Sequence, residues 1–180
     1  MICTDLSQFN AGSVLIFNHV PKCAGATVGA FLDAHCPSVY RATMKEVARL
    51  ESQVVEGRAF DRGPVIIYGH YAHGLHGLFD DTVQCFYLTT FRDPLEIVRS
   101  RYKFAVDTLR YAGSFSDFVV DFDIPVLIPY LGYADRVQAE DRLPRDYALV
   151  GFTEDMGGFF SNLCKLLGIK ANEYSSRNVS

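Results

Sequence analysis

Four short apolar runs separated by helical patterns constrain the fold of this chain more than any other sequence feature. The runs cover residues 13–17, 65–68, 85–91 and 147–152. Each is almost continuously apolar and only four to seven residues long, which is typical of strands buried on both faces. Strands that alternate with helices predict an α/β domain in three layers, with a parallel sheet and helices on both of its faces.

Helices are predicted between and after these strands by apolar periodicity and by capping residues. The predicted helices cover residues 26–36, 44–55, 94–109, 116–122 and 154–167. Asp93 suits the N-cap of the third of these helices, Pro94 suits its first position and Glu96 completes a capping box. Thr153 is the expected N-cap of the last helix, and residues 123–145, with Pro144 among three prolines, are expected to be irregular.

Composition and charge exclude several classes of protein. The 180 residues suit one domain covering 1–180, and 49% apolar with 21% charged residues is ordinary globular composition. With 17 Lys and Arg against 21 Asp and Glu, the net charge of −4 disfavours a nucleic-acid binder, so any anion site must be local. No apolar run is long enough for a membrane span, and no signal peptide is expected. Five scattered cysteines without a CxxC pair indicate reduced thiols and a cytoplasmic protein.

The loop at residues 19–27, here called the cradle loop, is the first candidate site. It lies between a predicted strand and a helix N-terminus, at the sheet edge where ligands of parallel sheets bind. Its small residues allow close approach of a ligand, the N–H groups of the helix start favour an anion, and Lys22 and Thr27 add a charge and a hydroxyl. A phosphate or sulfate cradle and a tight turn with a solvated lysine both fit. The loop is not a Walker A motif, because Lys22 precedes Gly25.

Arg92 is the second candidate for anion binding. It follows a predicted strand, and its guanidinium can hold a phosphate in bidentate fashion. Ser100 lies roughly 10 Å further along the predicted helix, at 1.5 Å per residue, so that both side chains could contact one anion. The alternative is that Arg92 pairs with a nearby carboxylate and that Ser100 only fills a helix face, while Arg99 and Arg101 are solvated.

Three histidines follow the second predicted strand at a spacing of three residues. His70 comes directly after the strand and suits a general base, with His73 as the alternative. Together with His76 they suggest a metal site, but the glycines of this segment favour a loop and no carboxylate has the spacing of a zinc motif, so no metal is expected. Cys23 could be reactive at a helix N-terminus, but without a base partner it is expected to have a packing role.

These segments together resemble the sulfotransferases that use 3′-phosphoadenosine 5′-phosphosulfate (PAPS), and are closest to the carbohydrate branch that includes the heparan sulfate 2-O-sulfotransferases. The cradle loop, HVPKCAGAT, resembles the family's 5′-phosphosulfate loop, with Ala26 in place of the usual Thr. The Phe-Arg-Asp-Pro signature at residues 91–94, with Ser100 and Tyr102 after it, has the family's spacing. Further similarities are the Gly-His segment at residues 68–71, the segment 150–154 and the last four residues.

The resemblance implies a P-loop-like fold, PAPS as sulfuryl donor without a metal, and an acceptor hydroxyl, with a carbohydrate as the acceptor class and a lipid or small molecule as further options. It implies His70 and Lys22 as catalytic residues. The implied cofactor-binding residues are Lys22, Cys23, Ala24, Gly25, Ala26, Thr27, Arg92, Ser100, Arg177, Asn178 and Ser180.

Two other functions remain open at this point. Relatives continue beyond the position where this chain ends, which indicates a site that lacks a C-terminal segment, or a truncated domain that binds a nucleotide or a partner protein without turnover. A nucleotide kinase or NTPase on a related fold is the second alternative, and magnesium-dependent ATP turnover would favour it. The sequence does not determine the acceptor or the oligomeric state.

Overall fold

The computed structural model describes residues 2–3, 9–41, 64–70, 73–121, 128 and 131–170. Its core is a six-stranded sheet in the order β1-β6-β5-β2-β4-β3, in which five strands are parallel and β1 is antiparallel to β6. The strands are β1 (Ile2–Cys3), β2 (Val14–Asn18), β3 (Val39–Arg41), β4 (Val65–Gly69), β5 (Cys85–Phe91) and β6 (Leu149–Phe152). The four predicted strands are confirmed. The sequence analysis missed β1 and β3, because two and three residues are too short to show a pattern.

The central strand β2 determines where a ligand can bind. From β2 the chain forms β3 and β4 on one side of it and then crosses to β5 and β6 on the other side. All five residues of β2 are buried, as expected for a strand with neighbours on both edges and helices on both faces. The cradle loop follows β2, so it lies where the connections leave in opposite directions, and ligands of open α/β sheets bind at such a point.

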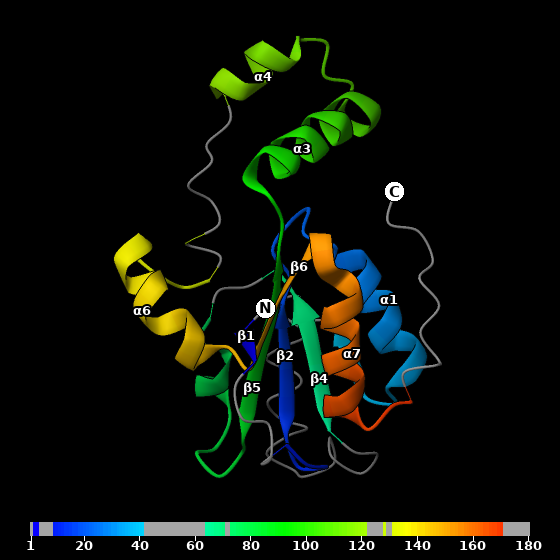
Figure 1. Ribbon diagram of the computed structural model, residues 1–180, viewed down its shortest axis with the longest axis vertical. Helices are drawn as coiled ribbons and strands as arrows, with labels where there is room; N and C mark the ends of the chain where they lie inside the picture. Colours follow the sequence, from blue (N-terminus) through cyan, green and yellow to red (C-terminus); the bar gives the residue numbers. More distant parts are fainter. Residues whose placement is uncertain are drawn as a thin grey trace.

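Two layers of helix and loop cover the sheet. Helices α1 (Gly25–His35) and α7 (Met156–Leu167) lie side by side on one face, where their apolar residues pack against Phe17 and Ile66. The other face, which includes Tyr87 and Tyr147, is covered by the 3₁₀ turn η2 (Leu75–Leu78), by residues 131–133 and by α6 (Arg136–Asp146), which lies apart from α1 and α7 in Figure 1. The predicted three-layer α/β architecture is confirmed.

Helices α3 (Pro94–Leu109) and α4 (Phe115–Asp121) lie beyond the carboxyl ends of the strands (Figure 1). The predicted apolar face of α3 is only partly buried: Val98 and Ala105 are buried, whereas Leu95 and Leu109 are 51% and 68% exposed. The reason is that α3 leaves the sheet, so that only part of its length contacts the core. Both helices stand on the side of the molecule where the cradle loop lies.

The N-cap of α3 is Asp93, as predicted, but the capping box is not formed. The Asp93 carboxylate accepts hydrogen bonds from the N–H groups of Leu95 (2.9 Å) and Glu96 (3.2 Å). The Glu96 carboxylate instead pairs with Arg99 at 2.5 Å, and the N–H of Asp93 donates to Oε1 of Glu154 at 3.1 Å. The carboxylate that accepts from the N–H of Asp93 therefore belongs to the 3₁₀ turn after β6, and it connects α3 to a different part of the fold.

The prediction of irregular chain up to residue 145 is wrong, because α6 covers Arg136–Asp146 with Pro144 inside its last turns. The helix is strongly polar, so no apolar stripe indicates it in the sequence. The carboxylate of Asp135 caps it by accepting from the N–H of Gln138 at 2.8 Å. Ion pairs between residues four apart stabilise it further: Arg136–Glu140, Asp141–Arg145 and Arg142–Asp146.

The N-cap of the last helix also differs from the prediction. Residues Thr153–Asp155 form a 3₁₀ turn, and α7 begins at Met156. Asp155, not Thr153, is the cap, because its carboxylate accepts from the N–H of Gly158 at 3.0 Å. The C-terminal cap at Gly168 has a left-handed backbone (φ 67°), which suits glycine.

Three further expectations concern the helix at residues 44–55, a membrane span and a metal site. The predicted helix at residues 44–55 lies outside the described residues. Within the described ranges, no helix combines the length and the apolar character that crossing a membrane requires. The same part of the chain contains no group of three His, Cys, Asp or Glu side chains arranged to hold a metal ion.

Candidate active site

Two residues of the cradle loop, just before α1, have a left-handed backbone conformation. Lys22 has φ 66° and Ala24 has φ 61°, which are unusual values for residues other than glycine. Ala24 is the N-cap of α1, and the right-handed helix begins at Gly25. A left-handed residue followed by a right-handed one turns successive N–H groups toward one side, an arrangement that binds anions. The positive end of the helix dipole has the same preference.

Hydrogen bonds within the loop show which N–H groups remain available at this helix start. The N–H of Cys23 donates to the carbonyl of Val20 at 3.3 Å, and the N–H of Thr27 donates to the carbonyl of Ala24 at 3.0 Å. Among the described residues, no hydrogen bond uses the N–H groups of Ala24, Gly25 and Ala26. These three N–H groups, rather than all five of residues 23–27, are the backbone donors left for an anion.

Two threonines of β5 hold the backbone on either side of this turn. Thr90 donates its hydroxyl to the carbonyl of Cys23, and Thr89 donates its hydroxyl to the carbonyl of Asn18 at 2.9 Å. Both threonine side chains are fully buried. Asn18 in turn donates from Nδ2 to the Tyr147 hydroxyl at 2.9 Å. The cradle loop is therefore fixed to the neighbouring strand by buried polar contacts, which restrict its conformation.

His19 and His70 form a stacked pair beside the helix start. Their ring centroids are 4.2 Å apart with an interplanar angle of 26°. The His19 ring lies so close to Gly25 that a Cβ at position 25 would come within 1.7 Å of it, so only glycine fits there. Burial and the neighbouring His70 lower the pKa of His19 to about 4, which keeps its imidazole neutral at neutral pH. His19 therefore fills space and orders the loop.

The tautomer of His70 follows from its contact with the cradle loop. Its Nδ1 lies 2.7 Å from the backbone carbonyl of His19, and a carbonyl oxygen can only accept a hydrogen bond. Nδ1 must then hold the proton, which leaves the basic lone pair of the neutral ring on Nε2. The residue is exposed and lies at the end of β4, next to the loop, where a general base for a bound ligand would be needed.

The side chain of Lys22 lies against α3. Its Nζ is 3.9 Å from the centroid of the Phe104 ring, a cation–π contact. Burial, and then the nearby charge of Arg101, lower the pKa of Lys22. Two cations thus lie close together at the helix start, an arrangement that a bound anion would stabilise.

The charges of Arg92 and Arg101 both influence the thiol of Cys23 in the cradle loop. Burial raises the pKa of the Cys23 thiol to about 12, although the charges of Arg92 and Arg101 and a hydrogen bond from the Arg92 backbone work in the opposite direction. The thiol stays protonated at neutral pH, which favours the packing role over a nucleophile. The two arginines and Lys22 therefore form a local group of three cations in a chain of net charge −4, and the carboxylate of Glu154 beside them acts on Cys23 in the opposite direction.

Arg92 and Ser100 do not contact each other in this structure. Nη2 of Arg92 lies 3.6 Å from Oε2 of Glu96, one turn into α3, and Glu96 makes the shorter contact of 2.5 Å with Arg99. Among the described residues, no hydrogen bond joins Arg92 to Ser100. The carboxylate pairing weighed in the sequence analysis is therefore present, though its distance is long and both side chains are partly exposed.

The remaining candidate residues lie elsewhere or outside the described part. His73 is separated from the cradle loop: its ring contacts the ring of Tyr87 in β5 in a tilted arrangement, with centroids 4.2 Å apart, and burial lowers its pKa. Arg177, Asn178 and Ser180 lie outside the described residues.

Three contributors to the site were missed in the sequence. The sequence predicts a solvated Arg101, and no motif singles out Phe104 or Thr90. A helical wheel places positions 101 and 104 one turn apart on α3, but only the direction in which α3 leaves β5 brings them to Lys22. Thr90 has a weaker sequence signal: it is a polar residue inside an apolar strand, two residues before the strand-end Arg92.

Comparison with known proteins bears on the fold. No protein-family model matches the sequence, and no match is found among curated proteins. Among solved structures, mouse sulfotransferase SULT7A1 complexed with PAP superposes with a TM-score of 0.52 at 16% identity, over 92% of this chain and 63% of that one. The fold is P-loop-like α/β. The prediction of this fold is confirmed, and the chain spans less than two thirds of that sulfotransferase.

Two further solved structures are similar at lower scores. Retinol dehydratase in complex with androsterone and PAP has a TM-score of 0.47 at 13% identity, over 89% of this chain and 60% of that one. A gluconokinase from Sinorhizobium meliloti also has a TM-score of 0.47, at 10% identity, over 88% of this chain and 92% of that one.

Proposed function

We propose that this chain is a PAPS-dependent sulfotransferase that transfers a sulfuryl group to an acceptor hydroxyl. The observation that carries the proposal is the cradle loop: three N–H groups at the start of α1, surrounded by Lys22, Arg92 and Arg101, with the imidazole of His70 at its edge. The sequence resemblance supports it, and so does the fold shared with a sulfotransferase complexed with PAP. The carbohydrate acceptor class rests on the sequence resemblance.

The charges near the cradle loop support a donor nucleotide as the ligand. A bisphosphorylated nucleotide carries two anionic groups, and the site offers two places for them: the helix start with Lys22, and the guanidinium of Arg92. A Walker A loop, which would hold a triphosphate and its magnesium ion, is absent from the sequence. This difference favours PAPS over ATP.

Each residue has a defined role in this proposal. When bound, PAPS supplies the sulfuryl group and its 5′-phosphate is the leaving group. Lys22 and the N–H groups of residues 24–26 stabilise the negative charge that grows on the leaving oxygen. His70 accepts the acceptor hydroxyl proton at Nε2, because Nδ1 already donates to the carbonyl of His19. The acceptor oxygen forms its bond to sulfur while the bond from sulfur to the phosphate oxygen breaks.

Nucleotide binding tests this proposal first. The unfolding temperature of the full chain is measured with 3′-phosphoadenosine 5′-phosphate (PAP), ADP and magnesium ATP at equal concentrations. PAP should stabilise the protein most, by about 2.7 kcal/mol at a concentration of 100 times its Kd. Equal stabilisation by all three nucleotides, or hydrolysis of ATP, would favour the kinase alternative instead.

Release of PAP from PAPS in the presence of hydroxyl-bearing compounds tests the reaction itself. His70→Ala should keep PAP binding and lose most of the transfer, since a general base contributes about 10²–10⁴ in rate. His73→Ala is the matched control, because His73 lies against Tyr87 and away from the cradle loop. An active His70→Ala variant with an inactive His73→Ala variant would contradict the assignment.

A further inference from the structure

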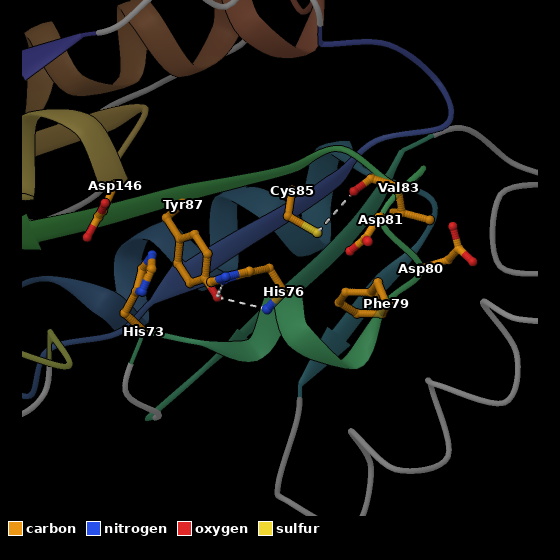
Figure 2. A pocket seen from close by; sticks show the side chains of 9 residues that line it. All are labelled: His73, His76, Phe79, Asp80, Asp81, Val83, Cys85, Tyr87 and Asp146. Atoms are coloured by element: carbon orange, nitrogen blue, oxygen red, sulfur yellow. Dashed lines mark hydrogen bonds between the residues drawn. The ribbon is translucent and has the colours of Figure 1, made fainter.

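A pocket lies on the face of the sheet opposite α1 and α7. Its volume is about 340 Å³. The described residues that line it are His73, His76, Phe79, Asp80, Asp81, Val83, Cys85, Tyr87 and Asp146. Figure 2 shows these side chains along β5, with His73 and Asp146 at one end, Phe79 and Asp80 at the other, and Tyr87 and His76 between them. None of these residues belongs to the cradle loop.

The Tyr87 hydroxyl fixes one wall of this pocket. It accepts hydrogen bonds from the N–H groups of Gly74 (3.1 Å) and His76 (3.0 Å), and it lies 3.1 Å from Nδ1 of His76. Since the two N–H groups use both lone pairs of the hydroxyl, its proton points to Nδ1. The η2 turn is held in place by three contacts with one buried side chain, so the pocket is preformed.

The lining of the pocket is acidic, in contrast to the cradle loop. It includes three aspartates and neither lysine nor arginine among the described lining residues. Asp146 is paired with Arg142 at 3.2 Å and accepts from the Tyr133 hydroxyl at 3.2 Å, so its charge is compensated. Asp80 and Asp81 remain at the other end. Asp80 accepts from the N–H of Thr82 at 2.9 Å, which helps to lower its pKa and keeps the carboxylate ionised.

The aromatic rings give the pocket a second chemical preference. The His73 and Tyr87 centroids are 4.2 Å apart, and Phe79 lies at the acidic end (Figure 2). Rings beside carboxylates suit a small organic ligand that has a cationic group, hydroxyls and an apolar ring face. An anionic ligand would meet uncompensated carboxylates and no cationic side chain of the described lining, which is unfavourable.

We propose that this pocket binds a small hydroxylated molecule that carries an ammonium group, of which an amino sugar is the simplest example, with the ammonium at Asp80 and Asp81. The carboxylate end of the pocket lies away from the cradle loop, because Cys85 pairs with Val14 at the start of β2, whereas Gly69 pairs with Asn18 at its end. At about 3.3 Å per residue, Asp80 and Asp81, which precede Cys85, are more than roughly 13 Å from the level of His70 along the strands. The pocket is therefore a site separate from the cradle loop.

Three hexoses that differ in charge test the proposal without any nucleotide. Binding of glucosamine, glucose and glucuronate to the full chain at pH 7 is measured by ligand-observed NMR titration. Glucosamine should bind at least about fivefold more tightly than glucose, and glucuronate most weakly, as expected for an exposed carboxylate pair. In the double variant Asp80→Asn/Asp81→Asn the preference for glucosamine over glucose should fall below about twofold.

The matched control removes the same charge elsewhere. Asp107→Asn/Asp117→Asn changes two exposed carboxylates on α3 and α4 and should leave the preference intact. Equal binding of the three sugars, a preference that survives in the pocket variant, or a preference that the control variant also loses would overturn the proposal. Asp80- and Asp81-dependent glucosamine binding in a chain that does not bind PAP would support the pocket and refute the proposed function.

Discussion

Replacement of Thr90 by valine tests whether the cradle loop depends on its contact with β5. Valine has nearly the shape of threonine, so Thr90→Val removes the hydroxyl and leaves the packing of this fully buried side chain unchanged. The carbonyl of Cys23 then loses the hydroxyl that donates to it. A buried acceptor left without its hydrogen bond costs about 1–3 kcal/mol. For a domain of this size the melting temperature should fall by roughly 2–12 °C.

The adjacent residue provides a control for stability. Thr89 is also fully buried on β5, and its hydroxyl donates to the carbonyl of Asn18, the last residue of β2. Thr89→Val should destabilise the fold by a similar amount. Only Thr90 contacts the turn that presents the N–H groups of α1 to an anion. PAP affinity should therefore fall about three- to tenfold in Thr90→Val, roughly 0.7–1.4 kcal/mol, and change less than about twofold in Thr89→Val.

Melting curves in urea or heat give the stabilities, and calorimetric titration with PAP gives the affinities. If the two variants are equally destabilised and bind PAP equally well, the contact between Thr90 and Cys23 has no part in shaping the anion site. If Thr90→Val has wild-type stability, the hydroxyl makes no net contribution to the fold, and the argument from an unsatisfied carbonyl is wrong. Weak PAP binding by the unmodified chain would instead refute the proposed function.

Three further predictions concern the same site. Lys22→Ala should lower turnover at least about tenfold and PAP affinity less than about threefold, because the charge that Lys22 meets grows in the transition state; equal losses in steady-state kinetics and calorimetry would contradict this. Arg92→Ala should abolish most of an expected preference for PAP over ADP of about tenfold, or 1.4 kcal/mol, and leave ADP binding nearly unchanged in titrations. His19, whose pKa in the fold is about 4 against an ordinary 6.5, contributes stability that is present above pH 6.5 and is lost as the pH falls from there toward 4. Urea unfolding across this range should show that slope, and His19→Asn should flatten it.

The layered fold could be predicted because its strands are buried on both faces. Such strands must be apolar throughout, so β2, β4, β5 and β6 are visible in the sequence as runs. Helices α1, α3, α4 and α7 were also found within a residue or two of their ends, since they pair an apolar face with a clear start or stop. A segment that is buried by a neighbouring layer must be apolar on the buried side, so its apolar residues reveal it in the sequence.

Elements that are stabilised by other means show no such apolar pattern in the sequence. The α6 helix depends on an N-cap and on ion pairs between residues four apart, and its Pro144 indicates an interruption when the sequence is considered alone. The cap of α3 illustrates the same limit: Glu96 has the spacing of a capping box, but the carboxylate that accepts from Asp93 belongs to Glu154, which is 61 residues away. Long-range contacts of this kind depend on the topology and cannot be derived from spacing.

The candidate site also contains residues that the sequence reveals and residues whose positions depend on the topology. The cradle loop, Arg92 and His70 each directly follow a strand, so the rule for parallel sheets selects all three from the sequence. Arg101 and Phe104 lie several residues into a helix, and their approach to Lys22 depends on the angle at which α3 leaves the sheet. The pocket beside Tyr87 depends on a hydrogen-bonded turn and on Asp146 from a distant helix, which no local pattern joins.

The cradle loop and the pocket beside Tyr87 have opposite charge, and this difference determines which ligand each site favours. A chain of net charge −4 has a local excess of cations at the cradle loop and a local excess of carboxylates at the pocket. An anionic ligand is therefore favoured at the first site and disfavoured at the second, while an ammonium-bearing ligand has the reverse preference. The cradle loop and His70 follow the carboxyl ends of β2 and β4, whereas Asp80 and Asp81 precede the first residue of β5, so the two sites lie toward opposite ends of the sheet. Each site therefore selects its own ligand without blocking the other site.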